Sequence, residues 1–403
     1  MNVSLVIVGH IDHGKSTLIG RLLYDSESLP DEKLAEIQKV IEEYKKRFEF
    51  AYFLDSYEEE LKEERTIDTT RVLFKGKNYY TIVDVPGHRE FIKNMLSGAS
   101  HAQVGILVVS APNGVEEQTR RHTFLLNMLG IKQIVVAINK MDLMDYEEGA
   151  FNKVKDETLQ LVSSLGYSGV RFVPVSALEG DNVYKPSQRM AWYKGPTLIQ
   201  LLDEMEPEEM SEKPLRFIVQ DTYSVDSEKV IVGRVESGGL SKGDELVFQP
   251  SGAKAKVEKV KVYPQDIEKA GAGDSIGIVI GSEVARGNVA GHLQTPPTPV
   301  TSFLGEMVLL EGTLHDGDEF EIKCGTRLTR GLVKGIRERI SSETGEVIGQ
   351  NVSQIKENEA ATVVFETEPI VVEKFYEIPE LGRFIVVKGR KNVGAGIVLE
   401  AIV

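Results

Sequence analysis

Cysteine is nearly absent from this 403-residue sequence, in which Cys324 is the only one. A single cysteine excludes an internal disulfide and any metal cluster built from cysteines, and it is typical of a reducing compartment. Basic residues are too few to balance the acidic ones, because 47 lysines and arginines face 62 aspartates and glutamates, a net charge of −15. This charge argues against broad binding of nucleic acid such as DNA or of an anionic membrane, although a local basic patch is compatible with it.

Long apolar runs are also missing. No run reaches the ~18 residues that a membrane span needs. The chain enters its first predicted strand at Val3 without a basic and then apolar leader, so we expect a cytoplasmic protein. There is no low-complexity tract, and 41% hydrophobic with 27% charged residues is typical of globular proteins. A chain of this length is predicted to form two to four domains.

Short β-branched runs alternate with helical stretches from residue 3 to about 205. The predicted strands read VSLVIV, YYTIVDV, VGILVVSA, QIVVAINK and VRFVPVSA. Continuous apolar strands of this kind are buried on both faces, as in a parallel sheet covered by helices. Apolar residues at steps of three and four predict covering helices over 17–24, 90–97 and 118–129. The first half of the chain is therefore predicted to be α/β.

The pattern changes after residues 204–214, EMEPEEMSEKP, which are acidic and aperiodic and predict a linker. Short alternating strands with Gly/Asp turns follow, and they indicate antiparallel barrels or sandwiches. The segment HLQTPPTPV at 292–300 separates two such units. We therefore predict three domains, over 1–208, 214–293 and 298–403.

The first predicted strand runs into GHIDHGKS, residues 9–16, which fits the pattern G-x-x-x-x-G-K-[ST]. The glycines let backbone N–H groups converge on phosphate oxygens, Lys15 reaches the β- and γ-phosphates, and the Ser16 hydroxyl coordinates Mg²⁺. A strand before the loop and a helix after it favour phosphate binding over an ordinary glycine turn. The candidate residues are Ile11, Asp12, His13, Gly14, Lys15, Ser16 and Thr17.

A second element, DVPGH at residues 84–88, ends the predicted strand YYTIVDV. The Asp84 carboxylate can reach Mg²⁺ through a water, and the Gly87 amide can contact a γ-phosphate and lose that contact after hydrolysis. Alone, DVPGH would be a plain turn. Its place at a strand end of a phosphate-binding domain favours a nucleotide-sensing role.

A third element, NKMD at residues 139–142, again follows a strand. The Asp142 carboxylate can accept hydrogen bonds from the ring N–H and the exocyclic amino group of guanine, whereas adenine has no such pair of donors there. Asn139 and Lys140 belong to the same motif. The backbone of Ser176-Ala177-Leu178 can meet the guanine carbonyl. The predicted ligands are therefore GTP or GDP together with Mg²⁺.

These four elements together resemble the GTPase superfamily, and GHIDHGKST with DVPGH is similar to its translation-factor class. GRVESGGLSKGDELVFQP and GRFIVVKGRKNVGAGIV resemble the β-barrels of that class, so the resemblance covers the whole chain. It implies a P-loop GTPase domain with a parallel-type sheet, followed by two antiparallel β-barrel domains, and a switch driven by GTP hydrolysis. It also implies that His88 orients the attacking water and that Thr66 joins Ser16 and Asp84 around Mg²⁺.

The sequence departs from that family just before Thr66. The family usually has Gly-Ile there, whereas this chain has Glu64-Arg65. The isoleucine is thought to form an apolar gate with Ile11, which keeps the histidine away from the water. Arg65 could instead approach the γ-phosphate and stabilise the transition state, or it could pair with nearby glutamates in solvent.

Three kinds of partner are compatible with these motifs. SALEGDNV, MAWYKGPTL and IKCGT look closest to the GTPase subunit of the two-subunit ATP sulfurylase, in which GTP hydrolysis is coupled to adenylyl sulfate synthesis by a separate catalytic subunit. This resemblance makes the catalytic ATP sulfurylase subunit the expected partner. The alternative is an elongation-factor-like GTPase that delivers aminoacyl-tRNA to the ribosome. A stand-alone assembly GTPase with a protein client is a third, weaker interpretation.

Overall fold

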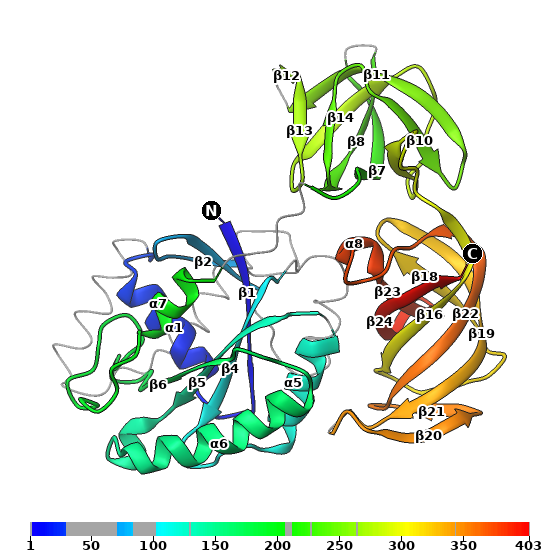
Figure 1. Cartoon of the computed structure of the whole chain (residues 1–403). Coiled ribbons are helices and arrows are strands. Elements are labelled where there is room, and N and C mark those ends of the chain that lie inside the picture. The colour runs from blue at the N-terminus through cyan, green and yellow to red at the C-terminus, as the bar shows by residue number, and fades with distance from the viewer. Residues whose placement is uncertain are drawn as a thin grey trace. The chain divides into compact units, whose positions relative to one another are not determined.

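The computed structural model describes residues 2–29, 71–83, 102–128, 130–205, 212–225, 228–262, 265–342 and 344–402. The chain divides into two units, Met1–Pro207 with the short stretch Ser342–Gly345, and Glu208–Ser341 with Glu346–Val403. The first unit is α/β, and the second consists almost entirely of strands (Figure 1). The predicted fold class, an α/β domain followed by two antiparallel barrels, is confirmed.

A six-stranded sheet forms the middle of the first unit, in the order β2-β3-β1-β4-β5-β6. Its strands are β1 (Asn2–Gly9), β2 (Arg71–Lys75), β3 (Tyr79–Val83), β4 (Val104–Ser110), β5 (Gln133–Asn139) and β6 (Arg171–Pro174). Five of them are parallel, as their apolar runs predict. The sixth, β2, is an antiparallel edge strand that we did not predict. It pairs with β3 because only three residues, 76–78, separate the two strands.

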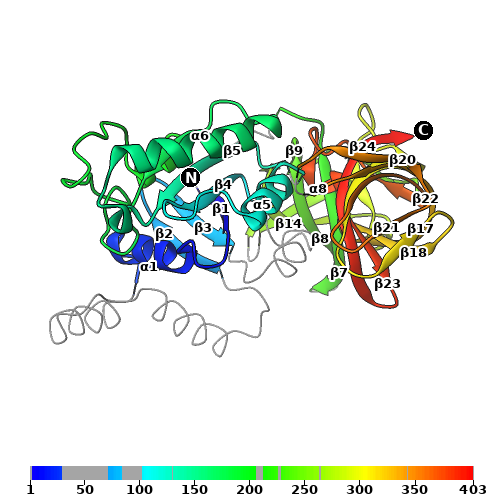
Figure 2. The same cartoon turned by 90° about the horizontal axis from the view of Figure 1, so that it is seen from below.

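Helices cover both faces of this sheet. They are α1 (Lys15–Asp25), α5 (Glu117–Met128), α6 (Glu148–Ser164) and α7 (Leu198–Asp203). Helices α1 and α7 share one core with the strands, whereas α5 and α6 lie on the opposite face (Figures 1 and 2). The helices predicted over 17–24 and 118–129 correspond to α1 and α5. The one predicted over 90–97 lies outside the described residues. We did not predict α6, although its apolar residues Phe151, Val154 and Leu161 are buried at helical spacing.

Strand order places the carboxyl ends of the parallel strands along one edge of the sheet. Strand β1 has β3 on one side and β4 on the other, so the direction in which strands are added reverses beside it. In open α/β sheets, ligands bind outside the carboxyl ends of the strands at such a reversal. The loop that follows β1, between Gly9 and Lys15, lies at this point.

The second unit contains two barrels. In the first, six strands close a ring in the order β10-β15-β7-β8-β14-β11, and β12 extends it. In the second, β18-β23-β24-β16-β22-β19 close a ring that β20 extends. The first set comprises β7 (Arg216–Val225), β8 (Glu228–Ser237), β10 (Glu245–Gln249), β11 (Ala253–Val262), β12 (Gln265–Ile267), β14 (Ser275–Ile280) and β15 (Val289–His292). The second comprises β16 (Pro299–Leu309), β18 (Glu319–Cys324), β19 (Arg327–Ile340), β20 (Val347–Val352), β22 (Ala360–Val371), β23 (Arg383–Lys388) and β24 (Lys391–Ile402). Short pairs complete the unit, namely β9 (Gly239–Ser241) with β13 (Lys269–Gly271) and β17 (Thr313–His315) with β21 (Gln354–Lys356).

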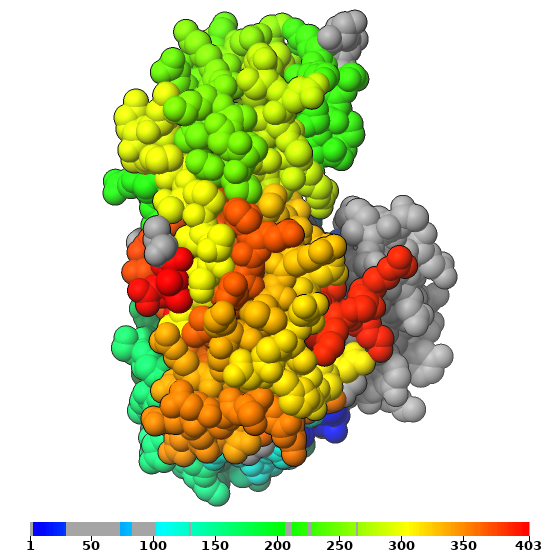
Figure 3. Space-filling view, turned by 90° about the vertical axis from the view of Figure 1, so that its right-hand side faces the viewer, coloured from blue at the N-terminus to red at the C-terminus, as the bar shows by residue number. Residues whose placement is uncertain are grey.

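The two barrels contact each other within this unit (Figure 3). A buried apolar cluster joins them, built from Ile218, Val289, Val371, Ile378 and Leu381. Beside it, the buried Arg216 side chain donates from Nε to Glu373 Oε1 at 2.7 Å. A charged hydrogen bond with both partners mostly buried adds directional contact to the apolar one. No helix in the described part of the chain is long and apolar enough to cross a membrane.

Cys324 is expected to resist alkylation in the folded protein. Its thiol is buried in the second barrel's core and donates to the Leu381 carbonyl oxygen at 3.4 Å, and burial raises the pKa of the Cys324 thiol to about 12. The thiolate, which is the reactive form, is therefore almost absent at neutral pH. Iodoacetamide followed by mass spectrometry should show no adduct on the native chain and full modification in denaturant. Rapid native labelling would contradict the burial.

Candidate functional site

Two glycines hold the loop between β1 and α1 close to the neighbouring strands. Gly14 has φ +90°, and a Cβ added there would lie 2.4 Å from Asn139 Nδ2. A Cβ on Gly9 would lie 2.3 Å from the Val108 carbonyl oxygen. Such distances are far below van der Waals contact, so both positions require glycine. The loop therefore runs tightly against β4 and β5, with its backbone gathered at the start of α1.

Lys15 is the first residue of α1, and its side chain folds back over this loop. Its Nζ donates to the carbonyl oxygens of Gly9 at 3.0 Å and His10 at 2.8 Å. Ser16 and Thr17 follow in the first turn and are partly exposed. A helix N-terminus with a lysine beside it is suited to anionic phosphate. The arrangement can therefore bind a polyphosphate.

In the described part of this loop, the Ser16 hydroxyl is a candidate ligand for a divalent cation. Among the described residues, no group of three or more His, Cys, Asp or Glu side chains is placed to hold a metal ion. This donor set fits Mg²⁺, which usually keeps waters and phosphate oxygens and takes only one or two protein ligands. It does not suit a metal that needs a cage of protein ligands.

His13 anchors the same loop from below. Its side chain is fully buried, with Nδ1 3.2 Å from the Val108 carbonyl oxygen and Nε2 2.7 Å from Glu116 Oε2. His10 Nε2 lies 3.7 Å from the same carboxylate. Burial lowers the pKa of His13, and the hydrogen bonds to Glu116 and Val108 oppose that shift only in part. The ring is therefore a structural support that holds the loop between β1 and α1.

We expect His13 to make the protein less stable as the pH falls below about 6.5. Because its pKa is lowered from 6.5 in the folded chain, the unfolded chain binds the proton first. The stabilising contribution is present above the unfolded pKa and is lost as the pH falls through the folded pKa. Denaturant unfolding of the parent and of His13→Asn should be compared at about pH 7.5 and about pH 5. The acid-induced loss should be smaller in the variant, and equal losses would refute this assignment.

The tip of the loop is exposed. Ile11 has 62% of its surface accessible, and its backbone N–H donates to Gln118 Oε1 at 3.2 Å. Asp12 next to it has φ +65° in the left-handed region, which aspartate tolerates. These two residues therefore face solvent at the tip of the loop.

Asn139 connects the phosphate loop to a second loop, which contains Ala177 and lies 38 residues after Asn139 in the chain. It ends β5 and is almost fully buried, with 2% exposure. Its Nδ2 donates to the His13 carbonyl oxygen at 2.9 Å, and its Oδ1 accepts from the Ala177 N–H at 2.9 Å. Both polar ends of one side chain are thus used to fix two loops relative to each other.

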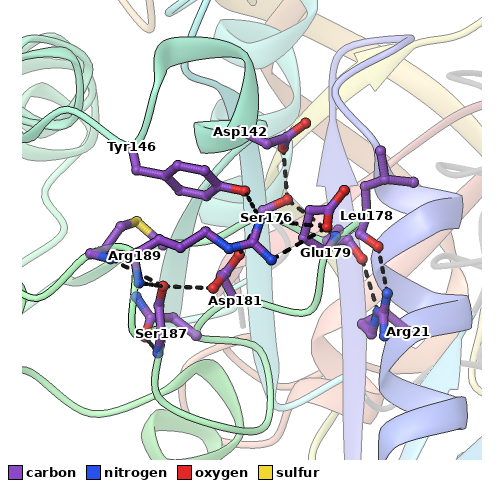
Figure 4. Close-up of polar contacts among 12 residues, drawn as sticks. Arg21, Asp142, Tyr146, Ser176, Leu178, Glu179, Asp181, Ser187 and Arg189 are labelled. Carbon is purple, nitrogen blue, oxygen red and sulfur yellow. Dashed lines mark hydrogen bonds and ion pairs between the residues drawn. The ribbon is translucent and has the colours of Figure 1, made fainter. Parts of the chain in front are cut away.

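Asp142 is turned toward the same loop by the backbone. Lys140 adopts φ +63°, and a 3₁₀ turn over Met141–Met144 follows. Ser176 Oγ donates to Asp142 Oδ1 at 2.7 Å and accepts from the Glu179 N–H at 3.2 Å (Figure 4). The carboxylate is only partly buried and is held in one orientation. It can therefore accept two hydrogen bonds from a planar ligand edge.

An arginine on α1 holds the loop that contains Ala177 and Leu178. Arg21 Nε donates to the Ala177 carbonyl oxygen at 3.1 Å, and its Nη2 donates to that of Leu178 (Figure 4). Asp25, one turn along α1, lies 3.5 Å from Nη1. The helix that starts at the phosphate loop is therefore linked directly to the loop beside Asp142.

A second arginine supports this region from the other side. Arg189 Nη2 lies 3.4 Å from Glu179 Oε2, its Nη1 donates to the Tyr146 hydroxyl, and its guanidinium lies 5.1 Å from the centre of that ring (Figure 4). The Trp192 Nε1–H donates to the Tyr146 carbonyl oxygen at 2.8 Å. The segment 187–192 thus packs against the turn that follows Asp142.

Several predicted site residues lie outside the described residues. They are Thr66, Asp84, Gly87 and His88, together with Glu64 and Arg65. The structure does bring together the others, since the loop 9–17, Asn139, Asp142 and 176–178 meet at the carboxyl ends of β1, β5 and β6.

The sequence did not reveal Arg21, Glu116, Gln118 and Arg189 as part of this region. Arg21, Glu116 and Gln118 contact segments that are remote in the chain, and Arg189 contacts Glu179, ten residues before it. None of the four belongs to a motif of fixed spacing. The sequence indicated only that Arg21 lies on the helix that begins at Lys15, six residues before it. It could not show which loop lies beside that residue.

Comparisons with known proteins agree over both units. Residues 1–208 match the family model for the elongation factor Tu GTP binding domain, and residues 302–399 match the GTP-eEF1A C-terminal domain-like family. Elongation factor 1-alpha of Methanothermobacter thermautotrophicus is 39% identical over 413 residues, covering 100% of this chain and 98% of the relative. That of Archaeoglobus fulgidus is 40% identical over 412 residues, covering 99% and 97%. This chain belongs to the elongation factor Tu and elongation factor 1-alpha family of translation GTPases.

Proposed function

We propose that this chain is a GTP-hydrolysing switch that delivers aminoacyl-tRNA to the ribosome. The observation that carries the nucleotide part is the pair of hydrogen bonds that Asn139 makes to both loops, together with the Ser176 bond to Asp142. These contacts hold the loop 9–17 and the Asp142 carboxylate close to each other, which supports one site for phosphate and base. A guanine nucleotide requires both at once, because its polyphosphate and its base are at opposite ends of the molecule.

The geometry supports the following residue roles. Lys15 and the backbone N–H groups around Gly14 would bind the β- and γ-phosphates. The Ser16 hydroxyl would hold Mg²⁺, which neutralises phosphate charge during hydrolysis. Asp142 would accept from the ring N–H and amino group of guanine, and the loop 176–178 would donate an amide to the guanine carbonyl.

Hydrolysis itself would depend on residues that the sequence assigns. Thr66 and Asp84 would complete the surroundings of Mg²⁺, and the Gly87 amide would contact the γ-phosphate. His88 would orient the attacking water. When the γ-phosphate leaves, the contacts to Thr66 and Gly87 would be lost, and this difference between the two nucleotide states is what a switch needs.

The relatives support the tRNA interpretation over the sulfurylase one. Two relatives, at least 97% of whose length aligns with this chain, carry the name elongation factor 1-alpha. The short segments that look like the ATP sulfurylase GTPase subunit are a weaker basis than identity along the whole chain. The domains predicted over 214–293 and 298–403 would then provide the surfaces for the tRNA.

A deacylation assay tests this proposal. Labelled aminoacyl-tRNA is incubated with the chain and either a non-hydrolysable GTP analogue or GDP, and the surviving ester is measured over time. We expect slower deacylation with the GTP analogue than with GDP. If neither nucleotide state protects the ester, delivery of aminoacyl-tRNA is wrong. If the chain instead makes an added ATP sulfurylase subunit GTP-dependent, the sulfurylase partner is the right one.

A further inference from the structure

We infer that Arg21 is a positioning residue that sets recognition of the guanine carbonyl. It would act through the loop 176–178 and not by touching the nucleotide. This inference rests on the proposed guanine nucleotide site, and it adds a residue from α1 to base recognition. Its basis is the pair of backbone hydrogen bonds that Arg21 makes to two successive peptide groups.

The contacts of Arg21 are unusual for an arginine on a helix surface. Its side chain is only 14% exposed, and the ion pair with Asp25 directs the guanidinium along α1. Both carbonyl oxygens that it binds, those of Ala177 and Leu178, belong to the loop. Charged donors to carbonyl groups form stronger hydrogen bonds than neutral ones, and low exposure reduces competition from water.

Holding these carbonyls fixes the direction of the loop amides. In a trans peptide the C=O and the following N–H point in opposite directions. When Arg21 holds the Ala177 carbonyl on the α1 side, the Leu178 N–H points away from α1. The Ala177 N–H is directed by Asn139 and the Glu179 N–H by Ser176. The loop is thus held by three side chains in one conformation, in which the Ala177 and Glu179 N–H groups are used within the protein and the Leu178 N–H is directed away from α1.

Arg189 provides a contrast on the same loop. A cavity of about 350 Å³ is lined by Glu179 and Gly180, which follow the loop, and by both Arg21 and Arg189. Arg189 binds the Glu179 carboxylate and the Tyr146 hydroxyl but no carbonyl of the loop 176–178 in the described part of the chain, and it is 49% exposed. Its ion pairs with Glu179 and Asp181 involve carboxylates and not the peptide groups of the loop. Arg21 therefore holds the backbone of the loop, whereas Arg189 contacts side chains beside it.

Comparing the affinities for three nucleotides shows which group of the base the protein recognises. GDP presents the carbonyl, the ring N–H and the amino group. Inosine diphosphate lacks only the amino group, which Asp142 would bind. 6-Thioguanosine diphosphate keeps both donors to Asp142 but replaces the carbonyl oxygen with sulfur, which is a weak acceptor. A variant that impairs only the loop should therefore bind GDP and inosine diphosphate more weakly, whereas its affinity for the thio analogue should change little.

The experiment measures the affinities of the full chain for these three nucleotides by competition, for the parent and for Arg21→Met. Methionine keeps the apolar length of the side chain and removes its donors. We expect affinity for GDP and for inosine diphosphate to fall together by about 10- to 100-fold, the range expected for a lost charged hydrogen bond. Their ratio should stay unchanged, whereas the preference for GDP over the thio analogue should shrink. Arg21→Lys should recover part of the loss.

A matched variant makes the result specific. Arg120→Met, on the exposed side of α5, should keep the parental order and ratios of affinities. Equal losses for all three nucleotides in Arg21→Met would show a merely structural role and overturn the inference, as would unchanged affinities. If the parent chain binds none of the three, the proposed function itself is wrong and this inference goes with it.

Discussion

Asp142→Asn is expected to exchange the base preference of the site from guanine to xanthine. The carboxylate has only acceptors, which suit the two adjacent donors of guanine, whereas asparagine has one acceptor and one donor. The amino group of guanine would then face the amino group of the asparagine side chain. Each of these two groups is a donor, so neither would have a partner. Xanthine, with a carbonyl in place of the amino group, matches asparagine. Affinity for GDP should fall on the order of 10³- to 10⁴-fold, and affinity for xanthosine diphosphate should rise.

A control for this exchange lies three residues away. Asp145 is exposed on the same turn and has φ +49°, a conformation that asparagine adopts as readily as aspartate. Asp145→Asn removes the same charge without touching the Ser176 hydrogen bond. Calorimetric titration of both variants with the two diphosphates should show the exchange in Asp142→Asn alone. A similar loss in Asp145→Asn would attribute the effect to net charge, and an unchanged GDP affinity in Asp142→Asn would disprove the assignment of Asp142.

Asn139→Ala is expected to destabilise the first unit and to weaken nucleotide binding together. The substitution leaves the His13 carbonyl oxygen and the Ala177 N–H without the partner that each has now. An unpaired buried polar group costs about 1–3 kcal/mol, so two such groups should lower the unfolding free energy by about 3 kcal/mol. Both loops of the site also lose their common support, so release of bound GDP should be faster.

Fluorescence of Trp192 can follow this loss directly. It is the only tryptophan in the chain and lies in the first unit, so its signal in a denaturant titration reports on that unit. Asn152→Ala is the matched control, because Asn152 is exposed on α6, where alanine is a good helix former. The control should be neutral or slightly stabilised. If Asn139→Ala unfolds at the same denaturant concentration as the parent, the bridging role of Asn139 is refuted.

Local patterns were sufficient to predict much of the fold. The parallel strands of the first unit are continuous apolar runs, and their burial on both faces is a property of each run by itself. The barrel strands alternate between buried and exposed positions, which is also visible in the sequence. By contrast, β2 as an antiparallel edge depended on which strand it could pair with, and α6 was missed although its spacing was regular.

The candidate site divides in the same way. Gly14, Lys15 and Ser16 stand at a fixed spacing because one turn of backbone must surround a phosphate, so the sequence alone indicates their chemistry. The link from Asn139 to Ala177 spans 38 residues, and that from Arg21 to Ala177 spans 156. Contacts over such distances have no signature of spacing, because the intervening chain can have any length.

The sequence by itself determined the motifs from which the guanine nucleotide site is proposed: a glycine loop with a lysine, a serine hydroxyl and an aspartate carboxylate, each defined by a few neighbouring residues whose backbone geometry is local. Only the tertiary structure decided which side chains hold those groups in place. Strand order brings the ends of β1, β5 and β6 to one edge, and this places Arg21, Glu116 and Asn139 within hydrogen-bond distance of loops that are remote in the chain. Hydrogen bonds depend on distance in space, and strand order sets that distance.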